Sequence, residues 1–273
     1  MDSIKKAAKA IKEADYLIIT AGAGMGVDSG LPDFRGVEGF WKAYPYAKKL
    51  NVRFEELANP IWFESKPHMA WAFYGHRLNL YRETKPHIGF KILLDIAKSK
   101  KDYFVITSNV DGQFQKAGFS ENKIDEIHGS ISYLQCQDYR CKSGIWSAKE
   151  TKIEVDMQNF VAKEPLPRCK VCNRVARPNI LMFNDFNWNP TREQAQRANL
   201  ESFLNSIKDS KVAIVEFGAG KAVPTIRYIS EDLAKSFNAT LIRVNPRDTD
   251  VPNGAISIAS GAKDACLKIE ALI

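Results

Sequence analysis

Four of the five cysteines fall into two closely spaced pairs. Cys136 and Cys141 have four residues between them, and Cys169 and Cys172 have two. In a reducing compartment this spacing indicates a zinc site rather than disulfides, because two such pairs can place four thiolates around one tetrahedral ion. Four thiolates fill the coordination sphere, so the zinc would be structural. The alternative is redox or core cysteines, and Cys266 is expected in the core.

A glycine-containing turn follows the first apolar run of the sequence. Gly22, Ala23 and Gly24 come directly after residues 16–20 and precede a helix-like segment. Glycines there permit a tight turn and let backbone N–H groups approach a pyrophosphate at a helix N-terminus. The acidic residue expected about 20 positions later in a dinucleotide-binding dehydrogenase has no clear counterpart. The pattern therefore argues against an ordinary dehydrogenase.

Polar residues follow a second apolar run at residues 103–107. Asn109 can donate and accept hydrogen bonds, and Asp111 can accept one from a carboxamide. Ligands of open parallel sheets bind where the strands end, although such residues also form ordinary turns. His128 lies just ahead of the cysteine-bearing segment, and an ordinary pKa near 6.5 suits a general base. The other histidines are expected to be structural: His68, His76 and His87.

The elements that must position these residues alternate along the chain. Apolar runs predict buried strands at 16–20, 103–107, 212–215 and 241–244, and helix-like stretches cover 87–97, 190–207, 224–236 and 261–272. Strands that are apolar on both faces and alternate with helices indicate a parallel sheet. The predicted fold is α/β, a Rossmann-like doubly wound parallel sheet.

Two stretches interrupt this alternation. Residues 37–81 are rich in aromatic side chains and predict a helix over 64–81, and residues 130–176 carry the four paired cysteines. The sheet pattern is expected to resume near 178–183. We therefore predict a Rossmann-like lobe and a smaller lobe that two insertions form. The predicted larger lobe comprises residues 1–36, 82–129 and 177–273, and the smaller comprises the helical insert 37–81 and the zinc-binding insert 130–176.

The amino-acid composition is typical of a globular protein. Of 273 residues, 45% are hydrophobic and 26% are charged, which suits a globular fold with a sizeable core. No uncharged run exceeds 12 residues, too short for a membrane-spanning helix of about 20. The first residues lack the pattern of a secretory signal, so a cytoplasmic location is expected. A net charge of +7 favours acidic ligands but is spread along the chain.

Taken in order, these motifs resemble those of the sirtuins, over nearly the whole chain. The segment from Gly22 to residue 35 is similar to the sirtuin nucleotide loop, and residues 107–111 resemble the Thr-Gln-Asn-Ile-Asp segment. Residues 127–129 resemble the turn that carries the catalytic histidine, and the cysteines follow where the zinc module belongs. The resemblance implies an NAD-dependent protein lysine deacylase, with NAD as cosubstrate, an acylated-lysine protein or peptide as substrate, and a structural zinc.

The resemblance also implies roles for individual residues. The acyl-lysine carbonyl oxygen would attack C1′ of the nicotinamide ribose while His128 helps to deprotonate a ribose hydroxyl, giving nicotinamide and O-acyl-ADP-ribose. Asn109 would engage the ribose and an ordered water, and Asp111 would fix the nicotinamide. Residues of a loop that covers the nicotinamide pocket, of the phosphate turn and of the adenosine-ribose contact complete the NAD site: Asp33, Phe34, Arg35, Ser108, Gly218, Ala219, Gly220 and Asn245.

The chain departs from the sirtuin pattern at several positions. Gly218-Ala219-Gly220 lacks the hydroxyls of the usual Gly-Thr-Ser turn, a loss that the charge of Lys221 would offset. Gly26 stands where serine is usual and Ser108 where glutamine is usual. Residues 183–185 read Phe-Asn-Asp where the peptide-holding loop generally reads Phe-Gly-Glu. These changes bear on nucleotide affinity and on peptide binding.

Tyr74 and Arg77 suggest the kind of acyl group. They lie three residues apart on a predicted helix, hence on one face, and an arginine fork beside a phenol can hold a carboxylate. The pair resembles the Tyr-x-x-Arg of sirtuins that remove malonyl and succinyl groups. The equally simple alternative is an amphipathic helix with both side chains at its solvent edge.

Two other functions remain open from the sequence. The altered loop at residues 183–185 allows an NAD glycohydrolase or a protein mono-ADP-ribosyltransferase on the same fold. A nucleic-acid-binding zinc ribbon is disfavoured, because only Tyr139, Arg140 and Lys170 lie within the cysteine pairs as basic or aromatic residues. No membrane partner is expected, and no oligomeric state is predicted.

Overall fold

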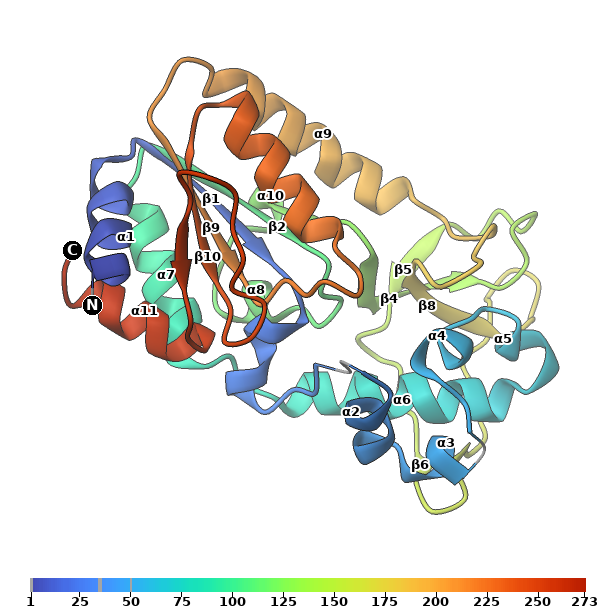
Figure 1. Cartoon of the computed structure of the whole chain (residues 1–273). Coiled ribbons are helices and arrows are strands. Elements are labelled where there is room, and N and C mark those ends of the chain that lie inside the picture. The colour runs from blue at the N-terminus through green and yellow to red at the C-terminus, as the bar shows by residue number, and fades with distance from the viewer. Residues whose placement is uncertain (1, 34–35, 50) are drawn as a thin grey trace.

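The computed structural model describes residues 2–33, 36–49 and 51–273. Its main feature is a parallel sheet of six strands in the order β11-β10-β9-β1-β2-β3 (Figure 1). The strands are β1 (Tyr16–Ala21), β2 (Asp102–Thr107), β3 (Ile124–Glu126), β9 (Val212–Phe217), β10 (Thr240–Val244) and β11 (Ile256–Ile258).

Helices cover both faces of this sheet. On one face lie α1 (Asp2–Glu13), α7 (Ile88–Lys98) and α11 (Ala262–Glu270), and on the other lie α9 (Thr191–Ser206) and α10 (Thr225–Ser236), as Figure 1 shows. Side chains of β1 alternate between the two layers: Leu17 and Ile19 pack with the first group, and Ile18 packs with the second. Because both faces are covered, the central strands are mostly apolar, and the charged side chains that they do carry, such as Glu216 and Arg243, are buried. The predicted doubly wound α/β fold is confirmed.

The register of the central strands explains where a ligand site can form. Strand β1 pairs with β2 on one side and β9 on the other, with Ala21 opposite both Thr107 and Phe217. The turns that follow these three strands therefore open at the same edge of the sheet. Strand order reverses at this point, which is where open α/β sheets bind their ligands.

The rest of the chain builds a second core beside that edge. Its helices are α2 (Gly36–Ala43), α3 (Pro45–Lys49), α4 (Phe54–Leu57), α5 (Trp62–Ser65) and α6 (Pro67–Glu83). Strands β4 (Gly129–Cys136), β5 (Ile145–Ser147) and β8 (Ala176–Ile180) form an antiparallel sheet, and β6 (Val155–Asp156) pairs with β7 (Val161–Ala162). Short connecting elements are η1 (Ala23–Ser29), α8 (Gln113–Lys116) and η2 (Glu121–Lys123).

Helix α6 is the central helix of this second core. It begins with Pro67 in its first turn, where the missing N–H of proline is harmless. Trp71, Phe73, Tyr74 and Leu78 are all buried, so the helix is enclosed on most sides and has no wide solvent face. The helix predicted over 64–81 therefore exists with slightly shifted bounds, and its environment is more buried than an amphipathic surface helix would have.

The strand expected at 178–183 was assigned to the wrong sheet. Strand β8 ends at Ile180 and pairs antiparallel with β4 in the small sheet, rather than joining the parallel sheet. An apolar run predicts burial but does not say which sheet buries it. Strands β3 and β11 were not predicted, because each is only three residues long. The division of the chain into two lobes at the predicted boundaries remains a proposal.

No helix within the described ranges has the length and apolar character needed to cross a membrane.

Candidate active site

A cavity of about 740 Å³ lies at the edge where β1, β2 and β9 end. Its size is within the usual range for sites that bind small ligands, roughly 300–1,000 Å³. The sheet, helix α6 and the segment after β8 all contribute to its wall. Predicted site residues in the wall are Gly22, Ala23, Asp33, Tyr74, Arg77, Ser108, Asn109, Asp111, His128, Ala219 and Gly220.

Two predicted glycines have a packing role instead of lining the cavity. A Cβ atom on Gly24 would lie 2.7 Å from the Gly218 Cα, and one on Gly218 would lie 2.4 Å from Gly24 backbone atoms. Gly218 also has a φ of +59°, in the left-handed region that favours glycine. The turns after β1 and β9 thus touch backbone to backbone. That contact holds Gly22 and Ala219 at the cavity wall.

Asn109 is held in place by the turn after β1. Its Nδ2 donates to the Gly22 carbonyl oxygen at 2.9 Å, and its backbone N–H donates to Thr107 Oγ1 at 3.0 Å. The preceding Ser108 donates its backbone N–H to the Ala21 carbonyl oxygen. These bonds fix the amide at the cavity wall. Its Oδ1 is the acceptor that a bound ligand can use.

Asp111 is half-buried in the cavity wall. Its Oδ1 accepts a hydrogen bond of 2.9 Å from the Gln113 backbone N–H. Burial raises the pKa of this carboxyl to about 6, while that hydrogen bond acts in the opposite direction. The carboxylate is therefore the main form at neutral pH. In that form it can accept hydrogen bonds from a carboxamide.

His128 is the only histidine among the residues found to line this cavity. It follows β3, and its carbonyl oxygen accepts from the Leu181 backbone N–H at 2.9 Å. Burial lowers the pKa of the imidazole below its ordinary value near 6.5, and a backbone hydrogen bond with Ser108 opposes that effect. A neutral imidazole at pH 7 can accept a proton. The next residue, Gly129, has a φ of +75°, and a Cβ there would lie 2.2 Å from the Asn179 carbonyl oxygen.

The other three histidines have structural contacts and are not among the residues found to line the cavity. His68 Nδ1 lies 2.8 Å from the Ala162 carbonyl oxygen, and His76 Nδ1 lies 2.9 Å from the Tyr44 hydroxyl. The side chain of His87 caps α7 by accepting from the Gly89 backbone N–H.

Asn245 lies beneath the cavity wall. It is fully buried, and its Nδ2 donates to the Ala219 carbonyl oxygen at 2.9 Å. Its Oδ1 accepts from the backbone N–H groups of Arg247 and Asp248, both at 3.0 Å. The residue ties the turn after β9 to the turn after β10. Asn245 therefore supports the cavity wall from beneath and is not among the residues found to line the cavity.

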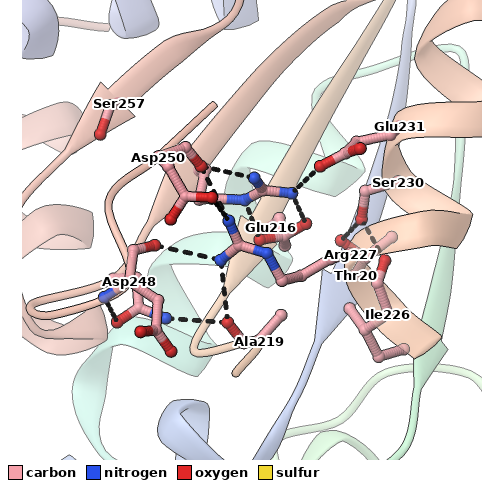
Figure 2. A network of polar contacts seen from close by, with 12 residues as sticks. Thr20, Glu216, Ala219, Ile226, Arg227, Ser230, Glu231, Asp248, Asp250 and Ser257 are labelled. Atoms are coloured by element: carbon pink, nitrogen blue, oxygen red, sulfur yellow. Dashed lines mark hydrogen bonds and ion pairs between the residues drawn. The ribbon is translucent and has the colours of Figure 1, made fainter. Parts of the chain in front are cut away.

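Buried arginines reinforce the same region. Arg227, on α10, donates to the carbonyl oxygens of Asp248 and Asp250 and to the Asp250 carboxylate, as Figure 2 shows. Arg243, on β10, is paired with Glu216 and Glu231. These bonds hold the loop after β10 against α10. The turn after β9 is therefore held in place without side-chain hydroxyls at Ala219 or Gly220, through the bonds that Asn245 and Arg227 donate to the Ala219 carbonyl oxygen.

Two further cations stand at the cavity wall. Lys221 Nζ lies 2.8 Å from the Asp250 carboxylate, and Arg247 Nη2 lies 2.7 Å from Asp33 Oδ2. Arg247 and Asp33 both line the cavity, so their ion pair links the segment after η1 to the loop after β10. Sequence reasoning missed Arg247. Two predicted residues, Phe34 and Arg35, lie outside the described residues.

Tyr74 and Arg77 are buried in the cavity wall. Tyr74 is 1% exposed and Arg77 is 6% exposed, so a place at the solvent edge of an amphipathic helix is excluded. Burial raises the pKa of the Tyr74 phenol, which stays protonated at neutral pH. The guanidinium of Arg77 lies 5.2 Å from the Phe73 ring centroid and 5.6 Å from that of Tyr74. Both a positive charge and a phenol are therefore available inside the cavity.

The segment after β8 supplies an apolar part of the wall. Leu181, Met182 and Phe183 line the cavity, and the Phe183 backbone N–H donates to the Ala58 carbonyl oxygen. Asp185, where the sirtuin pattern has glutamate, is fully buried and paired with Arg177. Asp185 is thus an internal anchor of the loop. The sequence marks Asp185 as a departure from the sirtuin pattern but does not predict its pairing with Arg177.

The four paired cysteines come together as predicted. Their Sγ atoms all lie within 4.8 Å of one another, with 3.4 Å between Cys136 and Cys172 and 3.6 Å between Cys141 and Cys169. A tetrahedral zinc with Zn–S bonds of about 2.3 Å requires sulfur separations of about 3.8 Å. These distances fit zinc and are too long for disulfides. None of the four is among the residues found to line the cavity, which fits a structural metal.

The sequence of this chain is similar to those of known proteins. The model of the Sir2 family matches residues 22–215. A relative from Leptospira interrogans is 32% identical over 227 residues, which cover 83% of this chain and 79% of the relative. One from Pyrococcus abyssi is 31% identical over 249 residues, covering 91% and 88%. Both relatives are named NAD-dependent protein deacylases.

Solved structures agree at the level of the fold. A Sir2 homologue in complex with NAD has a TM-score of 0.71 and 24% identity, and covers 97% of this chain and 92% of its own. A mutant Sir2 homologue in complex with ADP-ribose has a TM-score of 0.73 and 23% identity, covering 98% and 95%. The family match over most of the sequence, together with relatives above 30% identity, shows that this chain belongs to the Sir2 family.

Proposed function

We propose that this chain is an NAD-dependent protein lysine deacylase that transfers the acyl group to ADP-ribose and releases nicotinamide. The observation that carries the proposal is the meeting of Asn109, Asp111 and His128 in one cavity. The Sir2 family membership and the names of the curated relatives support the same reaction.

The residues of the cavity suit the parts of NAD. The turns at Gly22 and Ala219 present backbone to the cavity, as a pyrophosphate site requires. Lys221 and Arg247 lie in the same wall, each paired with an aspartate whose place a pyrophosphate can take. Asp111 is positioned to accept from a carboxamide. Bound NAD would supply an electrophilic ribose carbon with nicotinamide as its leaving group. The cavity volume of about 740 Å³ is large enough for a ligand of this class.

Asn109, His128 and the apolar wall residues have different roles in this reaction. Asn109, fixed by the Gly22 carbonyl oxygen, orients the ribose and a water molecule at the C-terminal end of β2. His128, neutral at pH 7, takes a proton from a ribose hydroxyl. The apolar side chains of Leu181, Met182 and Phe183 limit the access of bulk water to the reacting atoms.

The cavity also supports acidic acyl groups as substrates. Tyr74 and Arg77 face the same cavity as His128, and a buried guanidinium attracts a carboxylate strongly because little water screens it. We infer that malonyl-lysine or succinyl-lysine is accepted in addition to acetyl-lysine. Replacing Arg77 by Met tests this inference. Desuccinylation should collapse while deacetylation survives, and parallel losses would rule out the assignment.

Product analysis tests the reaction itself. The protein is incubated with NAD and an acetyl-lysine peptide, and the products are identified by mass spectrometry. The proposal predicts equal amounts of nicotinamide, free-lysine peptide and O-acetyl-ADP-ribose. ADP-ribose without the acyl product would favour the NAD glycohydrolase, and an ADP-ribosylated protein would favour the mono-ADP-ribosyltransferase.

A further inference from the structure

Tyr81 shares the cavity-facing side of helix α6 with Tyr74 and Arg77. The three residues lie at positions i, i+3 and i+7, which place side chains along one helix face. All three line the cavity, and Tyr81 is only 6% exposed. Tyr81 is therefore placed to act on the same ligand group as Arg77.

The hydroxyl of Tyr81 orients the Arg77 guanidinium. Arg77 Nε donates to the Tyr81 hydroxyl oxygen at 3.0 Å. The guanidinium carbon also lies 5.4 Å from the Tyr81 ring centroid, in addition to its contacts with Phe73 and Tyr74. One hydrogen bond and three aromatic rings thus restrict the rotation of the guanidinium plane.

This arrangement leaves the Tyr81 hydroxyl with a hydrogen to donate. A guanidinium has donors but no acceptor, so the phenol accepts from Arg77 and must direct its own hydrogen elsewhere. Within the part of the chain that the structure describes, the only hydrogen bond of this hydroxyl is the one from Arg77. Burial raises the pKa of Tyr81, which keeps the hydrogen in place at neutral pH.

We propose that Tyr81 is a third recognition residue for acidic acyl groups, which positions Arg77 and donates its hydroxyl hydrogen to the terminal carboxylate. The proposal rests on the deacylase function and on the acyl preference proposed above. The substrate class is an acyl-lysine whose chain ends in a carboxylate. Acetyl-lysine has no such group and gains nothing from the hydroxyl.

Replacing Tyr81 by Phe removes the hydroxyl and keeps the ring. Steady-state kcat and KM are measured for succinyl-lysine and acetyl-lysine peptides of one sequence, with NAD saturating. We expect the KM for the succinyl peptide to rise about tenfold or more, the effect of losing a hydrogen bond to a charged group. The kcat/KM for the acetyl peptide should stay within about twofold of the unmodified protein. Tyr103→Phe is the matched control, because Tyr103 is buried in β2 and is not among the residues found to line the cavity.

The outcomes separate the two proposals. Equal losses on both peptides would assign Tyr81 a general structural role and overturn the inference, as would unchanged kinetics. If Arg77→Met abolishes desuccinylation while Tyr81→Phe leaves it intact, the acyl preference stands and only the role of Tyr81 is refuted. If the unmodified protein removes acetyl but not succinyl, both acyl proposals fail while the deacylase function stands.

Discussion

The buried ion pair between Arg177 and Asp185 connects β8 to the loop that lines the cavity. Asp185 accepts from both Nη atoms of Arg177, at 2.7 and 2.8 Å, and both side chains are fully buried. The same carboxylate accepts from the backbone N–H groups of Met182 and Asn187. Replacing Asp185 by Ala would leave a buried guanidinium and two backbone donors without their partner.

The expected loss of stability follows from this geometry. Removing one partner of a buried ion pair costs about 3–5 kcal/mol. For a chain of this size about 1 kcal/mol corresponds to roughly 2 °C, so the melting temperature should fall by about 6–10 °C. Asp264→Ala provides the control, because its ion pair with Lys268 is exposed and contributes at most about 1 kcal/mol.

Thermal unfolding followed by circular dichroism, with zinc present, measures both variants. The double variant Arg177→Met, Asp185→Leu should recover most of the loss, since an apolar pair can replace a buried ion pair. A melting temperature of Asp185→Ala within about 2 °C of the unmodified protein would refute the reasoning. A double variant as unstable as the single one would refute it too.

Two more predictions concern pH and metal. Catalysis needs a neutral His128 and an ionised Asp111. Burial lowers the pKa of His128 below 6.5 and raises the pKa of Asp111 to about 6. The value of kcat/KM should therefore fall as pH drops through about 6 and stay level from pH 7 to 8. A plateau that continues below pH 5 would contradict these roles. Cys169→Ser should lose the single zinc ion, measured by mass spectrometry of the metal, and should unfold at a lower temperature, because structural zinc contributes to folding. Cys266→Ala is the control and should retain zinc, since Cys266 is buried elsewhere in the core. Retention of zinc by Cys169→Ser would exclude the proposed set of four ligands.

The sequence predicts the parallel sheet well because burial on both faces leaves a clear apolar signal. The strands predicted at 16–20, 103–107, 212–215 and 241–244 all occur in that sheet, whereas β3 was missed because it is only three residues long and two of these are Asp125 and Glu126. Arginines of α9 pair with both carboxyl groups, at 3.0 Å for Asp125 and Arg197, although burial still raises the pKa of Asp125 to about 7. Local patterns cannot show a partner that lies about 70 residues away.

The site residues likewise include some that a local sequence pattern predicts and others that depend on distant contacts. Residues directly after strands, such as Asn109, were placed by a general rule about sheet edges, and the structure brings them into the cavity. Spacing put Tyr74 and Arg77 on one helix face but could not say whether that face is buried. The same spacing extended by four residues would have pointed to Tyr81. No local pattern marks the pairing of Arg177 with Asp185, because it depends on an irregular loop.

Nicotinamide release tests the central claim most directly: that one cavity brings NAD, an acyl-lysine and His128 together. The rate is measured with NAD alone and with NAD plus an acetyl-lysine peptide, for the unmodified protein and for His128→Ala. The account predicts release that depends on the peptide and falls by at least about a hundredfold in the variant, the contribution of a general base. Equal release with and without peptide, or full turnover by His128→Ala, would contradict it.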